Sequence, residues 1–252
     1  MTRLIFGTAL VIVAVTLLTT SMETRAHTEF GVSQAGVPHY PDLLTRTPAD
    51  LTIRIENGRK VLRFSNTVYN WGEGPLEVRP KQKPRNQTEA YQRIYSHGAD
   101  GTPTLYSETL IGTFVFHRNH HHWHFEGFAL YEILTVSGGQ LEASLKTTVC
   151  IRDNVNPEGG AESLPHFGWG ENGRCDKNAL EGLSVGYGDT YPWNIDGQSI
   201  DITELNDGCY MFQSTANPNR SIIESDYGNN SAAVGFRLSG TAISINDPTC
   251  SG

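Results

Sequence analysis

The chain has 252 residues, of which 38% are hydrophobic, and its formal net charge is −8. This length fits one large all-β domain or two small domains. The sequence shows no basic patch, which argues against nucleic acid as a partner. An acidic surface attracts cationic molecules instead, and amines are one such class.

The first 26 residues have the pattern of a secretory signal peptide. Arg3 precedes an uncharged apolar run over residues 4–18, and a polar stretch then ends at Ala26. The run is shorter than the roughly 20 residues that a membrane-spanning helix needs, and an uncleaved membrane anchor is the alternative. We expect cleavage after Ala26. The mature protein is then secreted, extracellular or periplasmic, with no membrane contact.

Short segments with alternating hydrophobic and polar residues follow one another along the rest of the chain. Asn57-Gly58 between two of them is a strong hairpin signal, and Gly98 and Gly101 bound the turn of a second predicted hairpin. Many short strands at this spacing indicate an all-β fold, and we predict a β-sandwich with long functional loops and little helix. Strands are expected at residues 51–55, 61–68, 91–95, 105–110, 111–116, 128–136, 208–215 and 233–238.

Five of the nine histidines lie in one short stretch, residues 116–125. His120, His122 and His124 occupy every second position, so a strand would place all three on one face. Three imidazoles on one rigid surface are typical of a copper or zinc site, and a histidine-rich surface loop is the alternative. We expect His121, Trp123 and Phe125 on the opposite face. His117 is also expected there, where it would matter less for metal binding.

The segment 153–181 lacks a strand pattern and is rich in Gly, Asn, Pro and charged residues, so we interpret it as a wall or lid near the site. In a secreted protein the four cysteines should form two disulfides, and three connectivities are open. Proximity in sequence favours Cys150–Cys175 and Cys209–Cys250.

Taken together, the motifs resemble the lysyl oxidase family, in a short microbial form without the extra domains of animal members. The similarity runs along most of the chain after the signal peptide, and the motifs occur in the family's order. They are Tyr40-Pro-Asp-Leu43, Val61-Leu-Arg-Phe64, His120-x-His122-x-His124, Lys146-Thr-Thr-Val-Cys150, Gly182-Leu-Ser-Val-Gly-Tyr-Gly-Asp-Thr-Tyr191, Ile200-Asp-Ile-Thr203, Asn217-Pro218 and Glu224-Ser-Asp-Tyr-Gly-Asn-Asn230.

The resemblance implies that residues 27–252 form a single catalytic domain. Its cofactors would be Cu²⁺, held by His120, His122 and His124, and lysine tyrosylquinone, a self-made cross-link between Lys146 and Tyr191. The implied reaction is oxidative deamination of a primary amine, either a small amine or a protein lysine, by O₂. An aldehyde, H₂O₂ and ammonia are the products.

The general base is the least defined role. A carboxylate with a pKa raised by partial burial is the natural choice. Asp189 lies two residues before Tyr191, on the same side of an extended segment as the ring, and we rank it first. Glu224 and Asp226 are alternatives, and each of the three carboxylates also fits a turn or capping role.

This sequence departs from animal members in several places. Leu130 stands where animal members have a histidine before the tyrosine of the strand that follows the copper motif. The sequence has four cysteines, fewer than theirs, and the stretch between Lys146 and Tyr191 is longer. Substrate specificity, including any preference for collagen or elastin, therefore does not carry over.

Two other classes of function remain open. A cupin-like metal oxygenase or hydrolase would use His120, His122 and Glu126, although a second cupin motif is missing. A non-enzymatic copper-binding β-sandwich would need the histidines but neither Lys146 nor Tyr191. Copper binding through a mature N-terminal His27 is a further, weaker hypothesis.

Overall fold

The computed structural model describes residues 36–81, 86–98, 101–118, 121–155 and 180–250, and of residues 140–148 only the backbone. The chain divides into two units, Met1–Gln34 and Ala35–Gly252, and the described residues all belong to the second. The predicted signal peptide lies outside the described residues and stays a prediction. Within the described ranges, no helix has the length and apolar character needed to cross a membrane.

Strands form nearly all of the regular structure in the described residues. One short 3₁₀ helix, η1, follows the last strand. The strands are β1 (Pro38–His39), β2 (Leu43–Thr45), β3 (Ala49–Glu56), β4 (Arg59–Asn70), β5 (Leu76–Arg79), β6 (Gln87–His97), β7 (Pro103–His117), β8 (His122–Thr135), β9 (Gln140–Val149), β10 (Glu181–Leu183), β11 (Gly188–Tyr191), β12 (Ser199–Asp201), β13 (Gly208–Ala216), β14 (Ser231–Ser239) and β15 (Ala242–Ile245), and η1 spans Pro248–Cys250.

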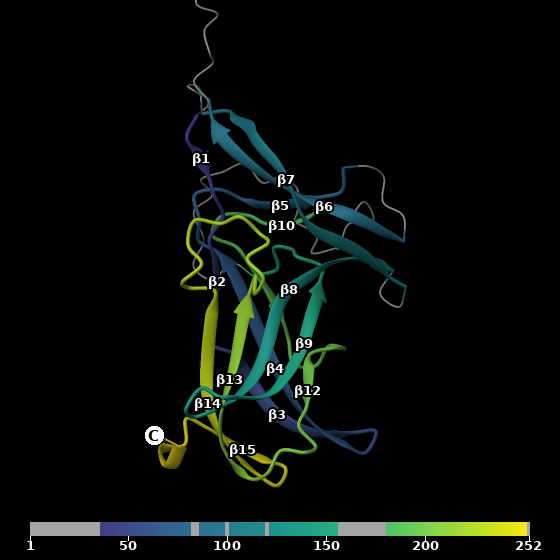
Figure 1. Ribbon diagram of the computed structural model, residues 1–252, viewed down its shortest axis with the longest axis vertical. Helices are drawn as coiled ribbons and strands as arrows, with labels where there is room; N and C mark the ends of the chain where they lie inside the picture. Colours follow the sequence, from purple (N-terminus) through teal and green to yellow (C-terminus); the bar gives the residue numbers. More distant parts are fainter. Residues whose placement is uncertain (1–35, 82–85, 99–100, 119–120, 156–179, 251–252) are drawn as a thin grey trace, which may run out of the picture. The chain divides into compact units, whose positions relative to one another are not determined.

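These strands form two antiparallel sheets. The larger sheet has the order β10-β5-β6-β7-β8-β13-β14-β15, with β1 added beside β6 and β9 beside β8. The smaller sheet is built around β4, which pairs with β2, β3, β11 and β12. Figure 1 shows β8, β9, β13 and β14 running side by side. The predicted all-β class is confirmed.

The two hairpins predicted from glycine-containing turns are both present. β3 and β4 join through Asn57 and Gly58, whose φ angles of 50° and 78° are the positive values that a type I′ turn requires. β6 and β7 form the second hairpin, and both strands extend beyond the predicted ranges. The ranges 105–110 and 111–116 belong to one strand, β7.

Aromatic side chains from both sheets meet in the core. Phe64 of β4 lies with its ring centroid 4.5 Å from that of Tyr131 on β8 and 4.4 Å from that of Phe212 on β13. All three side chains are fully buried. Because β4 belongs to the smaller sheet and β8 and β13 to the larger one, these contacts pack one sheet face against the other, as in a sandwich.

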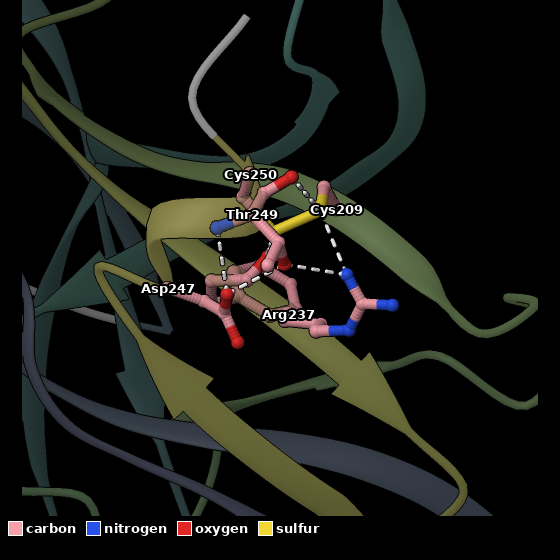
Figure 2. Close-up of a disulfide and its surroundings, with 6 residues drawn as sticks. Cys209, Arg237, Asp247, Thr249 and Cys250 are labelled. Atoms are coloured by element: carbon pink, nitrogen blue, oxygen red, sulfur yellow. Dashed lines mark hydrogen bonds between the residues drawn. A yellow bond between two sulfur atoms is a disulfide. The ribbon is translucent and has the colours of Figure 1, made fainter.

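One disulfide links the end of the chain to the larger sheet. Cys209 of β13 is bonded to Cys250 of η1, as sequence proximity predicted. Figure 2 shows how the neighbouring side chains hold the same turn: Arg237 donates to the Thr249 hydroxyl at 2.8 Å, and Asp247 accepts from the Thr249 backbone N–H at 2.9 Å. The predicted pairing of Cys150 with Cys175 stays a prediction, because Cys175 lies outside the described residues.

Truncation of Phe64 tests this packing. Phe64→Ala should lower the free energy of unfolding by about 3–5 kcal/mol, because it leaves a cavity between the two sheets. Leu110→Ala removes a side chain that is 50% exposed and should change the same quantity by no more than about 0.5 kcal/mol. Urea unfolding of both variants measures the difference. If both variants lost the same small amount of unfolding free energy, Phe64 would not belong to a core shared by the two sheets.

Candidate metal and quinone site

The described histidines of this stretch lie at the end of β7, in the turn that follows and at the start of β8. His117 at the end of β7 is the ladder partner of His122 at the start of β8. His121 lies in the turn with a φ of 60°, and its backbone N–H donates to the His117 carbonyl at 2.8 Å. Regular strand geometry therefore begins at His122.

Three imidazole rings gather on one face of this hairpin. The Nε2 atoms of His122 and His124 are 2.8 Å apart. The ring of His117 stacks on that of His124, with centroids 4.3 Å apart and an angle of 12° between the planes. The prediction that His117 points to the opposite face was wrong. Directly opposed residues of antiparallel strands share a face, and the register pairs His117 with His122.

The predicted alternation holds within β8 itself, but His121, which was expected on the same strand face as Trp123, lies in the turn before β8. Trp123 and Phe125 are buried in the core, on the face opposite His122 and His124. His120, the third predicted ligand, lies outside the described residues. Within those residues, no group of three His, Cys, Asp or Glu side chains forms a metal site. Two converging imidazole nitrogens are nevertheless the donor type that copper and zinc prefer, so the described residues fit part of the predicted site.

Tyr191 lies at the end of β11, partly buried against the core. Its hydroxyl donates to the backbone carbonyl of Cys150 at 2.8 Å. Burial raises the pKa of Tyr191 well above its usual value, and the nearby charges of Asp189 and Glu181 raise it further, with a partial offset from Arg152. The phenol is therefore held in its protonated, hydrogen-bond-donating form.

Asp189 is buried on the same strand. β11 is extended from Gly188 to Tyr191, so Asp189 and Tyr191 share a face, as the sequence predicted. The Asp189 carboxylate accepts from the Asn154 side chain at 2.6 Å and from the Arg152 backbone N–H at 3.3 Å. Burial raises its pKa well above the usual value, although Arg152 opposes that shift.

Glu181 is a member of this group that the sequence did not reveal. Its side chain is 1% exposed, and it accepts from the backbone N–H of Ile151 at 2.9 Å. Burial raises its pKa well above the usual value and the charge of Asp189 adds to the shift, while the backbone N–H groups of Ile151 and Phe125 oppose it. Phe125 directly follows His124, so Glu181 is close to the histidine strand. A lone Glu at the start of a three-residue strand carries no local signal.

The segment 150–155 docks residue by residue onto the segment 181–191. The first contacts are those of Cys150 with Tyr191, Ile151 with Glu181 and Arg152 with Asp189. Asp153 accepts from the Ser184 backbone N–H, and Val155 pairs with Gly188 in an isolated bridge. Asn154 bonds to both Asp189 and Thr190. This docking fixes the strand of Tyr191 to the chain that immediately follows β9.

β9 carries Lys146, whose backbone is paired with Leu130 of β8. Its side chain is not among those the structure describes, so a contact between Lys146 and Tyr191 is untested. The strand ends at Val149, which pairs with Phe125 next to His124. The backbone therefore brings the end of β9, the histidine strand and the docking segment of Tyr191 together, while Lys146 is paired with Leu130 further along β8.

The two alternative bases have other partners. Glu224 is buried and accepts from the Leu43 backbone N–H at 2.8 Å and from the side chains of Asn217 and Asn230 at 2.6 and 2.7 Å. Asp226 is exposed and accepts from the Gly228 backbone N–H at 2.7 Å. These contacts give both residues structural roles. The carboxylate charges that act on Tyr191 are those of Asp189 and Glu181.

Fold and site together define an all-β protein with paired imidazoles on one hairpin and a buried group of one phenol and two carboxyls near it.

The lysyl oxidase family model matches residues 91–248. Lysyl oxidase homolog 4 of Homo sapiens is 31% identical over 173 residues, 68% of this chain and 18% of that protein. Lysyl oxidase homolog 2B of Danio rerio is 32% identical over 166 residues, 65% of this chain and 20% of that protein. Lysyl oxidase homolog 2 of Xenopus laevis is 29% identical over 196 residues, 77% of this chain and 21% of that protein.

The chain belongs to the lysyl oxidase family, as the motifs indicated. Its matched region spans only about a fifth of these relatives. The cupin-like alternative loses its support, because the histidine motif lies inside the matched region.

The raised pKa of Glu181 makes stability depend on pH. A carboxyl with a raised folded-state pKa stabilises the fold below its unfolded pKa of about 4.3, and that contribution is lost as pH rises through the folded value. Glu181→Gln removes this titration. The free energy of unfolding of metal-free wild type should therefore fall relative to that of the variant as pH increases from 4.5 to 8. Urea unfolding midpoints of both proteins, measured at pH 4.5 and at pH 8, test this. A constant difference would mean that Glu181 titrates normally in the fold.

Proposed function

We propose that this protein is a secreted, copper-dependent amine oxidase that converts primary amines to aldehydes, with O₂ as the oxidant and H₂O₂ and ammonia as the other products. The observation that carries the proposal is the family match over residues 91–248, which contains the histidines, Lys146 and Tyr191 in one region. The geometry around Tyr191 supports it. Copper, when bound, supplies the O₂ chemistry that turns Tyr191 and Lys146 into lysine tyrosylquinone, and the quinone supplies the electron sink for amine oxidation.

His122 and His124 are the described residues that would hold copper, with His120 as the third ligand expected from the family motif. Their Nε2 atoms already lie 2.8 Å apart, so little movement is needed for both to face one ion. His117 stacks on His124 and fixes the plane of that ring. We assign His117 to ring orientation, because a misoriented imidazole cannot present its lone pair.

Lys146 and Tyr191 would form the cofactor. The lysine amine must be neutral to add to the oxidised ring, and desolvation favours that neutral form. For the tyrosine partner, the Cys150 carbonyl accepts a hydrogen bond from the Tyr191 hydroxyl and so fixes one edge of the ring. The docking of segment 150–155 onto segment 181–191 holds the Tyr191 ring close to the end of β9.

Asp189 is the proposed general base, which takes the proton from the substrate carbon next to nitrogen. Burial raises its pKa, and a higher pKa makes its carboxylate a stronger base than an exposed Asp. Asn154 and Arg152 hold both of its oxygens in place. The charge of Asp189 raises the pKa of Glu181, and the charge of Asp153 raises the pKa of Asp189.

Primary amines are the proposed substrate class, either small amines or lysine side chains of proteins. The formal net charge of −8 would attract such cations over long range. The curated relatives are named lysyl oxidase homologs, but this chain aligns with only about a fifth of each. The choice between a small amine and a protein lysine is therefore left to substrate assays.

Variants of the two cofactor residues test the quinone directly. Lys146→Ala and Tyr191→Phe should bind copper like wild type but release no H₂O₂ from amines, because neither can form the cross-link. Peptide mass spectrometry of copper-loaded, aerobically matured wild type should find Lys146 joined to Tyr191, and neither variant should show it. A wild-type protein that binds copper without this cross-link is a non-enzymatic copper-binding sandwich, and the proposal then fails.

Histidine variants separate ligands from the orienting residue. His122→Ala and His124→Ala should each reduce copper affinity at least 100-fold and abolish quinone formation, because each removes a direct ligand. His117→Ala should lower copper affinity by about 10-fold, the range typical of residues that orient a ligand. Calorimetric titration with Cu²⁺ measures all three, and His121→Ala serves as the exposed control. Equal affinities for His124→Ala and wild type would remove His124 from the site.

A further inference from the structure

A second pair of histidines meets far from the candidate site. β1 pairs with β6 so that His39 is opposite Tyr95, and His97 is two residues further along the same face. The Nδ1 atom of His97 is 3.1 Å from the Nε2 atom of His39. The ring planes form an angle of 59°, so the two rings meet nitrogen to nitrogen and do not stack.

A carboxylate on a third segment lies close to one of these rings. The Nδ1 atom of His39 is 3.5 Å from a carboxylate oxygen of Glu73. A carboxylate beside Nδ1 favours the proton at that nitrogen, which leaves the lone pair of His39 on Nε2, the atom that faces His97. The same arrangement of carboxylate, histidine and metal recurs in zinc proteins.

Backbone contacts hold the segment that carries Glu73 beside His39. The backbone N–H of Gly74 donates to the Tyr40 carbonyl at 2.9 Å, and that of Trp71 donates to the Asp42 carbonyl at 2.8 Å. A Cβ atom at Gly74 would lie 2.0 Å from the His39 carbonyl oxygen, so only glycine permits this approach. Residues 71–74 are thus held directly against residues 39–42, which brings the backbone of Glu73 close to His39, while its side chain stays 79% exposed.

We propose that His39 and His97 form a second binding site for a borderline divalent metal, Cu²⁺ or Zn²⁺, with water completing the coordination. Imidazole nitrogens bind these metals at about 2.0–2.1 Å. Two such nitrogens at adjacent positions around one ion lie roughly 3 Å apart, which agrees with the 3.1 Å separation found here. The side chain of His39 is 26% exposed, so water and ions can reach the pair. Cu²⁺ should bind more tightly than Zn²⁺.

This site is separate from the one on the β7–β8 hairpin. His97 is the ladder partner of Pro103 at the first residue of β7, and His117 is at the last. Fourteen residue steps along β7 at about 3.3 Å each amount to roughly 45 Å, and irregularities in the ladder shorten this only in part. No single ion can serve both places. The inference does not depend on the proposed amine oxidation.

The test uses protein in which the first site is disabled by His122→Ala and His124→Ala. Titration of this protein with Cu²⁺ alone should show a binding event whose electron paramagnetic resonance spectrum carries coupling to two nitrogens. Adding His97→Ala or His39→Ala should weaken it at least 10-fold and leave at most one coupled nitrogen. Glu73→Gln should weaken it by a smaller factor. His121→Ala, which removes an exposed histidine elsewhere, should leave it unchanged.

Circular dichroism melts of every variant confirm that the fold is kept. Copper binding that is unaffected by both His97→Ala and His39→Ala would overturn the proposal. So would the absence of any two-nitrogen signal in the protein without the first site. In that case the two rings share a proton in an ordinary hydrogen bond, which the 3.1 Å distance also permits.

Discussion

Phe125 is the position on which the site geometry depends, because β8 is paired on both sides there. It is the ladder partner of Phe114 on β7 and of Val149 on β9. Its side chain is fully buried, and a strand turns alternate side chains to opposite faces. Burial of Phe125 and Trp123 therefore puts His124 and His122 on the other face. A one-residue slip of β8 would exchange the two sets, so the hydrophobic core selects the face that presents the imidazoles.

The same double pairing explains why buried carboxyls collect nearby. β9 ends beside Phe125, and the chain then leaves the sheet as segment 150–155, whose backbone N–H groups need acceptors. Glu181 and Asp189 supply acceptors to Ile151 and Arg152. Both acids lose hydration, which raises their pKa values, and each raises the pKa of Tyr191. The acid groups thus satisfy the backbone and also set the electrostatics of the tyrosine.

The sequence predicted features that depend on local rules and missed those that depend on register. Asn57 and Gly58 specify their turn by backbone conformation alone, so the β3–β4 hairpin was predictable. The opposite orientation of His122 and Trp123 follows from the two-residue period of a strand. The orientation of His117 depends on which residue of β8 it opposes, and the turn length that sets this register was not readable. The predicted strand ranges also missed eight strands: β1, β2, β5, β9, β10, β11, β12 and β15. All of them except β9 are only two to four residues long, which is too short for an alternating pattern of their own.

The hydrogen bond from Tyr191 to the Cys150 carbonyl places a constraint on the proposed chemistry. A phenol can donate to a carbonyl, but a phenolate cannot, so loss of the proton turns this contact from attraction into repulsion between two oxygens. Burial and the charges of Asp189 and Glu181 oppose the phenolate as well. Any step of the proposed chemistry that needs the phenolate would therefore have to break the contact with Cys150. The hydrogen bond that holds the Tyr191 hydroxyl in the fold is thus the contact that ionisation of Tyr191 would remove.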